Sequence, residues 1–348
     1  MPVPRLKDVA KKSGVSVAAA SLALSGKGRI SQEVRARVRA AADELSYRVG
    51  VTPWPRPSNR AVVGVLHAED RPYEWNFVRP TFLEIERLLH QKGYNPVFLP
   101  LPARAPAEHA VRLASEAGVG AVFAVQYANA DAFTELTHRG IRVVVINNGG
   151  FQDQFHSVCV DDFQGAYEGT RTLLSLGHRV IAFVEYERPE HPGVVADRFI
   201  GFRKALEEHR APFAAEQRIT IAFIDQKRLG RKLASLFARA EPPTAIFAHD
   251  DYLGLYVIEA LRGLGLAVPD DVSLVAPGDV LDYSLPLIPQ ITTMRIDTSL
   301  LGRIAVDLLL ERMKSTDDGV HVLKVKEQLV RRASCRNVGQ RNAPGGKG

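Results

Sequence analysis

The hydrophobic positions at the start of the chain recur at the spacing of short helices. Leu6, Val9 and Ala10 share one side of a helix predicted over residues 6–12, and lysines occupy its other side. Gly14 then supplies a tight turn. Two helices joined by so short a turn cross steeply and at close range, so the pattern requires small side chains where they meet.

Two further helices are expected. Ser16 is a suitable N-cap for a helix that ends at Ser25, and Ser31 caps a third that runs to about Ser46. The third helix repeats apolar residues at helical spacing, namely Val34, Val38, Ala41 and Leu45. The crossing of the first two helices is kept thin by Ala10, Gly14 and Ala20, and its core comes from Val9, Val15 and Leu24. The pattern predicts a small all-α head of three helices.

After residue 60 the pattern changes to apolar runs separated by amphipathic stretches of helical length. The runs lie at 61–66, 96–101, 120–125, 142–147, 179–184, 219–224, 244–249 and 272–277. Residues 82–93 and 252–265 are examples of the amphipathic stretches. Strands that alternate with helices indicate parallel sheets of βαβ units, and this many strands fit two doubly wound halves better than one. The fold class is therefore α/β, with the all-α head in front.

The charge is concentrated in the head. The chain carries a net charge of +6, and residues 1–60 hold twelve basic but only four acidic side chains. A basic head on a near-neutral body indicates a polyanion partner for the head. The alternative is an ordinary three-helix cap whose charges face solvent.

Other sequence features narrow the class of protein. No apolar run is long enough to span a bilayer, and the first residues contain no apolar signal region, so no membrane partner and a cytoplasmic location are expected. Cys159 and Cys335 match no metal spacing and fit a reducing compartment. Asp250 and Asp251 are adjacent carboxylates, but no catalytic triad or dyad accompanies them. We expect no enzyme activity, no cofactor and no metal.

Residues 5–48 contain the stretches LKDVAKKSGVS, SLALSGKGRIS and VRARVRAAADELSYR. On these stretches the head resembles the DNA-binding domain of the LacI/GalR family of transcriptional regulators. The resemblance implies a helix-turn-helix whose residues after the Gly-Val-Ser turn face bases. The implied DNA-binding residues are Leu6, Lys7, Ser16, Val17, Ala18, Ser21, Leu22, Lys27, Arg29 and Arg56. Leu22 stands where family members commonly have arginine, so thymine methyl groups, Ser21 and DNA shape should contribute to base reading.

The segment at 49–60 departs from the family, which usually has a hinge helix there. Pro53, Pro55 and Pro57 forbid a regular helix and favour an extended segment. The hinge leucine, which wedges into the minor groove in the family, is replaced by Arg56 or the nearby Trp54. The alternatives are a Trp wedge, an arginine in a narrow minor groove, or a stiff linker.

The resemblance continues to about residue 335 and implies a periplasmic-binding-protein-like body. It rests on the stretches 160–184, 196–206, 244–255, 268–279 and 289–313. In the family two lobes close on a small molecule. We expect one lobe at 61–160 and 293–322, the other at 161–292 and 323–335, and a flexible tail at 336–348. The implied effector residues are Trp75, Phe77, Asp162, Arg198, Asp250 and Asp279.

Three of these effector residues, namely Arg198, Trp75 and Phe77, also have a structural alternative. Arg198 matches the family's ligand-gripping arginine but could form an interlobe salt bridge instead. Trp75 and Phe77 could stack on an apolar ligand face or fill the lobe. Asp250 stands where the family generally has asparagine, and a carboxylate facing a guanidinium suits a polyhydroxylated, sugar-like ligand.

The sequence thus predicts a ligand-responsive, sequence-specific transcriptional regulator. We expect a homodimer on palindromic operator DNA, with repression as the family's usual mode. The alternatives are a transcriptional activator with a different effector and a solute-binding protein of a transporter, against which the head and the absence of a signal segment argue.

Overall fold

The computed structural model describes residues 6–25, 30–45, 61–69, 75–187, 192–222, 225–314 and 319–338. The chain divides into two compact units. The first unit is Met1–Val158 with Leu301–Leu323, and the second is Cys159–Leu300 with Lys324–Gly348. The predicted linker at 49–60 lies outside the described residues.

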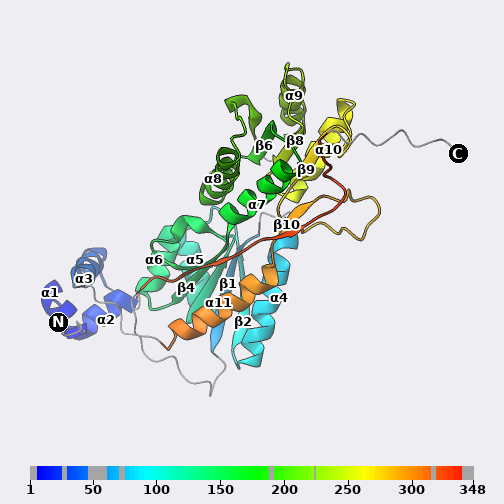
Figure 1. Ribbon diagram of the computed structural model, residues 1–348. Coiled ribbons are helices and arrows are strands. Elements are labelled where there is room, and N and C mark those ends of the chain that lie inside the picture. Colours follow the sequence, from blue (N-terminus) through cyan, green and yellow to red (C-terminus); the bar gives the residue numbers. More distant parts are fainter. Residues whose placement is uncertain are drawn as a thin grey trace. The chain divides into compact units, whose positions relative to one another are not determined.

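The head consists of α1 (Leu6–Ser13), α2 (Val17–Ser25) and α3 (Gln32–Glu44), as the sequence predicts (Figure 1). Both expected serine caps are present. Ser16 Oγ accepts a hydrogen bond from the amide of Ala19 at 3.1 Å, and Ser31 Oγ accepts one from Val34 at 3.3 Å. These bonds satisfy amide groups that the first turn of a helix leaves without partners, and so they fix where α2 and α3 begin.

The core of the head is built mainly from small side chains. Its buried members are Val9, Ala10, Ala20, Ala23, Leu24, Val38, Ala41 and Ala42. The expectation for Gly14 is wrong in one respect. No atom lies within 4 Å of the position where a Cβ would be, so Gly14 does not thin the helix crossing. Its φ of +68° shows that the turn needs glycine for its left-handed backbone.

The first unit contains a sheet in the order β11-β5-β4-β3-β1-β2. The strands are β1 (Val62–Ala68), β2 (Asn95–Leu101), β3 (Ala121–Val125), β4 (Arg142–Ile146), β5 (His156–Val160) and β11 (Val322–Val325). The neighbours from β2 to β5 pair in parallel. All five residues of β3 are buried, as expected for a strand covered on both faces.

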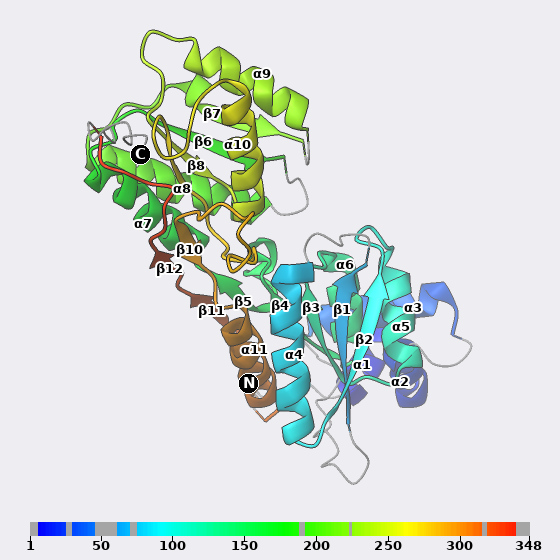
Figure 2. The ribbon, with the colours of Figure 1, turned by 90° about the vertical axis from the view of Figure 1, so that its right-hand side faces the viewer.

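Helices cover both faces of this sheet. The first face packs against α5 (Ala107–Glu116) and α6 (Ala130–His138), whose apolar residues join one core with the strands. The helices α4 (Trp75–Gln91) and α11 (Thr298–Arg312) lie side by side (Figure 2). They approach closely because Gly302 meets the carbonyl of Thr81 where a side chain would stand. A short 3₁₀ turn, η2, spans Gly149–Phe151.

The second unit has a parallel sheet in the order β7-β6-β8-β9. The strands are β6 (Ile181–Tyr186), β7 (Arg218–Ile221), β8 (Ala245–Ala248) and β9 (Ser273–Val275). One face packs on α7 (Asp162–Ser175) and α8 (Pro192–Glu208), and the other on α9 (Gln226–Phe237) and α10 (Asp251–Gly263). An antiparallel pair, β10 (Thr293–Arg295) with β12 (Gln328–Val330), and a 3₁₀ turn, η3 (Ala215–Gln217), complete the unit.

The α/β class with two doubly wound parallel sheets behind a three-helix head is confirmed. Residues 293–300, which the sequence assigns to the first lobe, group with the second unit. The predicted tail begins later than residue 336, because the amide of Arg336 donates to Ser273 Oγ at 3.1 Å and that of Val338 to the carbonyl of Leu176 at 2.9 Å. Residues 339–348 lie outside the described part of the chain. The exact domain limits stay predictions.

Candidate nucleic-acid interface and effector site

The helix α2 divides its side chains between the head core and the surface. Ala20, Ala23 and Leu24 are buried. The opposite face exposes Val17, Ala18, Ser21 and Leu22, and the N-cap residue Ser16 is exposed as well. Positions i, i+1, i+4 and i+5 lie on one face of a helix. The structure brings together the residues that the sequence assigned to base contacts.

The remaining predicted DNA contacts have different surroundings. Lys7 is exposed on α1, as a phosphate contact requires. Leu6 is only partly exposed and packs against the head core, so its side chain has a structural role. Lys12 pairs with Glu44, an ion pair that joins α1 to α3 at the surface. Lys27, Arg29 and Arg56 lie outside the described residues.

Trp75 belongs to a group of aromatic rings in the first unit. It is the first residue of α4 and is 39% exposed. The ring centroid of Trp75 lies 6.0 Å from that of His67 and 6.3 Å from that of Phe98. His67 is buried, and its Nδ1 lies 3.2 Å from the carbonyl oxygen of Val125. Phe77, predicted with Trp75, is half-buried.

His67 and Phe98 were not among the predicted effector residues. The position of His67 near the carboxyl end of β1 could have suggested it, since ligands bind at those ends in such sheets. Phe98 is the middle residue of β2, where no such signal exists. With His67 and Phe98 behind it, the Trp75 ring is held in place while one part of it stays accessible. A held aromatic ring of this kind is suited to stacking on the apolar face of a ligand.

Arg198 and Asp162 form a buried ion pair in the second unit. Arg198 Nε lies 2.7 Å from Asp162 Oδ1, and Nη1 of the same arginine donates to the carbonyl oxygen of His249. Burial raises the pKa of the Asp162 carboxyl, against the attraction of Arg198. Burial opposes the charge of Arg198, but Asp162, Glu327 and Asp250 outweigh it, and the pKa of Arg198 is raised. The arginine is therefore charged and already compensated by carboxylates.

Glu327 is a buried acid that sequence reasoning missed. It stands between β11 and β12 and is 4% exposed. Within the described part of the chain neither carboxylate oxygen has a hydrogen-bond partner, and burial raises its pKa well above the ordinary value. Its own amide donates to Gln164 Oε1 at 3.1 Å. The carboxyl group occupies the space where a Cβ at Gly165 would be, so any side chain at that position would require Glu327 to move.

Asp250 and Asp251 have separate structural tasks at the start of α10. Asp250 is the N-cap, and its Oδ1 accepts the amide of Leu253 at 2.7 Å. Asp251 is fully buried, and its Oδ2 accepts the amides of Val280 and Leu281 at 2.9 and 3.2 Å. Burial, together with the charge of Asp250, raises the pKa of Asp251 to about 7. This pair therefore holds a helix end and a loop.

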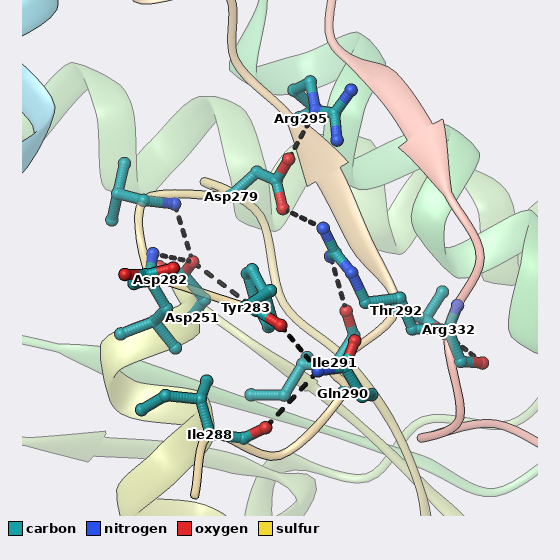
Figure 3. Close-up of polar contacts among 12 residues, drawn as sticks. Asp251, Asp279, Asp282, Tyr283, Ile288, Gln290, Ile291, Thr292, Arg295 and Arg332 are labelled. Atoms are coloured by element: carbon teal, nitrogen blue, oxygen red, sulfur yellow. Dashed lines mark hydrogen bonds and ion pairs between the residues drawn. The ribbon is translucent and has the colours of Figure 1, made fainter. Parts of the chain in front are cut away.

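Asp279 lies between two arginine side chains (Figure 3). One carboxylate oxygen pairs with Arg295 and the other with Arg332. Arg332 also donates to the carbonyl of Ile291 at 2.9 Å and stacks on the ring of Tyr283, with 3.7 Å between its guanidinium carbon and the ring centroid. Both oxygens of Asp279 are thus used inside the unit, which favours a structural role over direct ligand contact.

Among the described residues, no three or more His, Cys, Asp or Glu side chains are grouped so as to hold a metal ion. None of their helices is both long and apolar enough to cross a membrane.

Comparisons with known proteins agree with both parts of the fold. Residues 5–49 match bacterial regulatory proteins of the lacI family, and residues 170–335 match a periplasmic binding protein-like domain. The transcriptional repressor PurR of Pectobacterium carotovorum subsp. carotovorum is 28% identical over 336 residues, covering 94% of this chain and 96% of PurR.

Two solved structures show the same fold. The complex of the transcriptional regulator CelR with cellobiose has a TM-score of 0.67 at 24% identity, covering 95% of this chain and 99% of CelR. The lac repressor dimer bound to operator and the anti-inducer ONPF has a TM-score of 0.65 at 22% identity, covering 96% of this chain and 100% of the repressor. The relatives are transcription regulators. The chain therefore has the helix-turn-helix head of the lacI family of bacterial regulatory proteins and a periplasmic-binding-protein-like body.

Proposed function

We propose that this chain is a transcriptional repressor whose affinity for operator DNA changes when a small, uncharged, polyhydroxylated effector binds to its body. The observation that carries the proposal is the exposed face of α2, which leaves Val17, Ala18, Ser21 and Leu22 accessible while Ala20, Ala23 and Leu24 are buried in the head core. Such a helix enters the major groove and contacts base edges. Exposed basic residues nearby, such as Lys7, are available for phosphates.

The charges around Arg198 support an uncharged effector. Two of its donors, Nε and Nη1, are taken by Asp162 and the carbonyl of His249. Asp250 adds further negative charge near it, and the Glu327 carboxyl, whose pKa burial raises well above its ordinary value, faces the same guanidinium. An anionic effector would have to approach these carboxylates, whereas hydroxyl groups can both donate to carboxylates and accept from a guanidinium. We propose Arg198 and Asp250 as effector contacts, with Asp162 holding Arg198 and Asp279 holding Arg332.

The aromatic group of the first unit, taken by itself, is suited to the same class of ligand. Trp75 exposes a flat apolar surface, and sugars present an apolar ring face that stacks on such surfaces. CelR is a relative in fold whose structure contains cellobiose, a sugar without charge. We propose Trp75 as an effector contact and Phe77, which is half-buried, as support for it.

We further propose a homodimer that binds a two-fold symmetric operator in the bacterial cytoplasm. A single recognition helix reads only a few base pairs, and a dimer places two of them one helical turn apart. The lac repressor structure is a dimer bound to operator. The Pro-rich segment at 49–60 would act as the spacer between head and body.

A two-part experiment on the full chain tests this proposal. In the first part, the protein enriches duplexes from a random pool, and the enriched sequence is tested for two-fold symmetry. In the second, neutral sugars, sugar phosphates and sugar acids are screened by thermal shift, since a ligand at 100 times its Kd stabilises by about 2.7 kcal/mol. We expect a shift with a neutral sugar that also changes DNA affinity. A larger shift with a sugar phosphate would contradict the effector class, and activation of a reporter would contradict repression.

A further inference from the structure

The recognition face of α2 is almost entirely apolar. Val17 is 49% exposed and Leu22 is 39% exposed, and Ala18 between them is also exposed. None of these three residues belongs to the buried core cluster of the head or packs against it as a partly buried member. The head therefore does not need them for its own stability, although exposing large aliphatic side chains to water is unfavourable.

The same face has few groups that could form hydrogen bonds with bases. No charged residue occurs from Val17 to Ser25. The hydroxyl of Ser16 already accepts the amide of Ala19 as the N-cap of α2. Ser21 is the remaining exposed hydroxyl on this face. Bidentate reading of guanine or adenine needs an arginine, lysine, asparagine or glutamine, and α2 has none of them.

One group in the major groove suits an aliphatic face. The C5-methyl group of thymine is apolar and projects into the groove, where alanine and similar side chains contact it. We propose that α2 reads the C5-methyl groups of pyrimidines, and that 5-methylcytosine can therefore take the place of thymine at the positions that face Val17, Ala18 and Leu22. This inference rests on the proposed operator binding. It states that the C5-methyl group sets the base preference of α2, whether thymine or 5-methylcytosine carries it.

The consequence is a link between DNA methylation and binding. A cytosine at a position read by Leu22 presents no methyl group, and its exocyclic amine donates where thymine accepts. Methylation at C5 restores the apolar contact and leaves the amine unchanged. A site that differs from the operator by thymine to cytosine would then be bound more tightly after methylation than before it.

The test uses the full chain and a duplex of about 24 base pairs that the chain enriches from a random pool. Each thymine is replaced singly by deoxyuridine, which lacks only the methyl group, and affinity is measured by fluorescence anisotropy at one salt concentration. Burial of one methyl group corresponds to about a fourfold change in affinity. We expect about that loss at one or more positions in each half-site. At those positions 5-methylcytosine paired with guanine should bind about fourfold more tightly than cytosine.

Matched variants assign the effect to α2. Leu22→Ala and Val17→Ala keep a good helix former on an exposed face, so the head should still fold. Each variant should bring the ratio of the affinity for the thymine duplex to the affinity for the deoxyuridine duplex toward one. This change should occur at the base position that the replaced side chain contacts. The control is Leu83→Ala, a leucine 47% exposed on α4, which should leave the ratio unchanged.

The outcomes separate this inference from the function it rests on. If no sequence is enriched, operator binding itself is wrong. If a sequence is enriched and deoxyuridine is bound as well as thymine at every position, operator binding stands and methyl reading is overturned. An equal affinity for cytosine and 5-methylcytosine at the sensitive positions would overturn the proposed exchange of the two pyrimidines.

Discussion

Arg198 and Asp162 pair inside the second unit, with 2.7 Å between Nε and Oδ1 and only 7% of each side chain exposed. The pair joins α8 to the first turn of α7. Two charges removed from water are costly unless each compensates the other, so neither residue can be changed alone without leaving a buried charge. The guanidinium is thus held in one orientation by the protein itself, which is how a binding group is preorganised.

Replacing Arg198 by methionine should destabilise the protein by about 3–5 kcal/mol, because the buried Asp162 carboxylate loses its partner. Urea denaturation measures this change. The control is Arg262→Met, since Arg262 pairs with Glu259 at the surface and is 75% exposed, and the expected change there is below about 1 kcal/mol. The double variant Arg198→Met/Asp162→Leu should recover most of the loss. An equal loss in the double variant would show that the ion pair is not the cause.

Replacing Glu327 by glutamine should make the protein more stable at pH 8, by an amount on the order of 1 kcal/mol. The buried carboxylate has no hydrogen bond among the described residues, so ionising it is costly and little is lost when the charge is removed. Thermal unfolding at pH 5 and pH 8 checks this, with the exposed Glu116→Gln as the control. A variant less stable than the wild type at pH 8 would show that the Glu327 charge is needed beside Arg198.

Asp251 should make stability fall as pH rises between about 4 and 7. Its pKa is raised to about 7, so in that window the folded state holds a proton that the unfolded state has lost. About three pKa units correspond to at most about 4 kcal/mol. Urea denaturation across this range should give a flatter curve for Asp251→Asn than for the wild type. The exposed Asp153→Asn is the control, and an unchanged slope in Asp251→Asn would contradict the assignment.

Replacing Gly201 or Gly230 by alanine should change the stability of the protein in opposite directions. A Cβ at Gly201 would overlap the carbonyl oxygen of Phe163, because α7 and α8 touch there, so Gly201→Ala should cost about 3 kcal/mol or more. Gly230 lies inside α9 with no atom within 4 Å of a Cβ. Gly230→Ala should stabilise by about 0.5–1 kcal/mol through helix propensity. Equal effects on Tm would mean that α7 and α8 are not in close contact.

The sequence predicts the fold well where structure is local. The head helices, their serine caps and the strands with continuous apolar runs follow from patterns within ten or twenty residues. Missed strands lack that signal. The strand β5 has the sequence HSVCV, whose apolar run is only three residues long, and β10 and β12 are three residues each. Strands this short are defined by the partner they pair with, and β10 and β12 are more than thirty residues apart in the sequence.

The candidate site is harder to predict from the sequence because its contacts join residues that are far apart along the chain. Arg198 and Asp162 were both identified, but not as partners of each other. Asp279 was assigned to the effector, whereas the structure uses both of its oxygens for Arg295 and Arg332. Glu327 contacts a helix that begins 165 residues earlier, and no local pattern marks its burial. Apolar periodicity identifies a core, but the partners of buried charges depend on how distant segments pack.

The head should bind DNA with strong salt dependence and with a base preference set at position 22. Each phosphate contact lowers log affinity by about 0.9 per unit of log salt, so several contacts through lysines and arginines give a steep slope.

Leu22→Arg adds a side chain that can pair with guanine, which is worth about 1–3 kcal/mol of discrimination. Selection with the variant should therefore enrich guanine where the wild type selects a thymine. The variant Arg262→Met, altered on α10, should keep the wild-type site. An unchanged site in Leu22→Arg would mean that residue 22 does not reach the bases, and a flat salt response would mean that the basic side chains of the head do not meet phosphates.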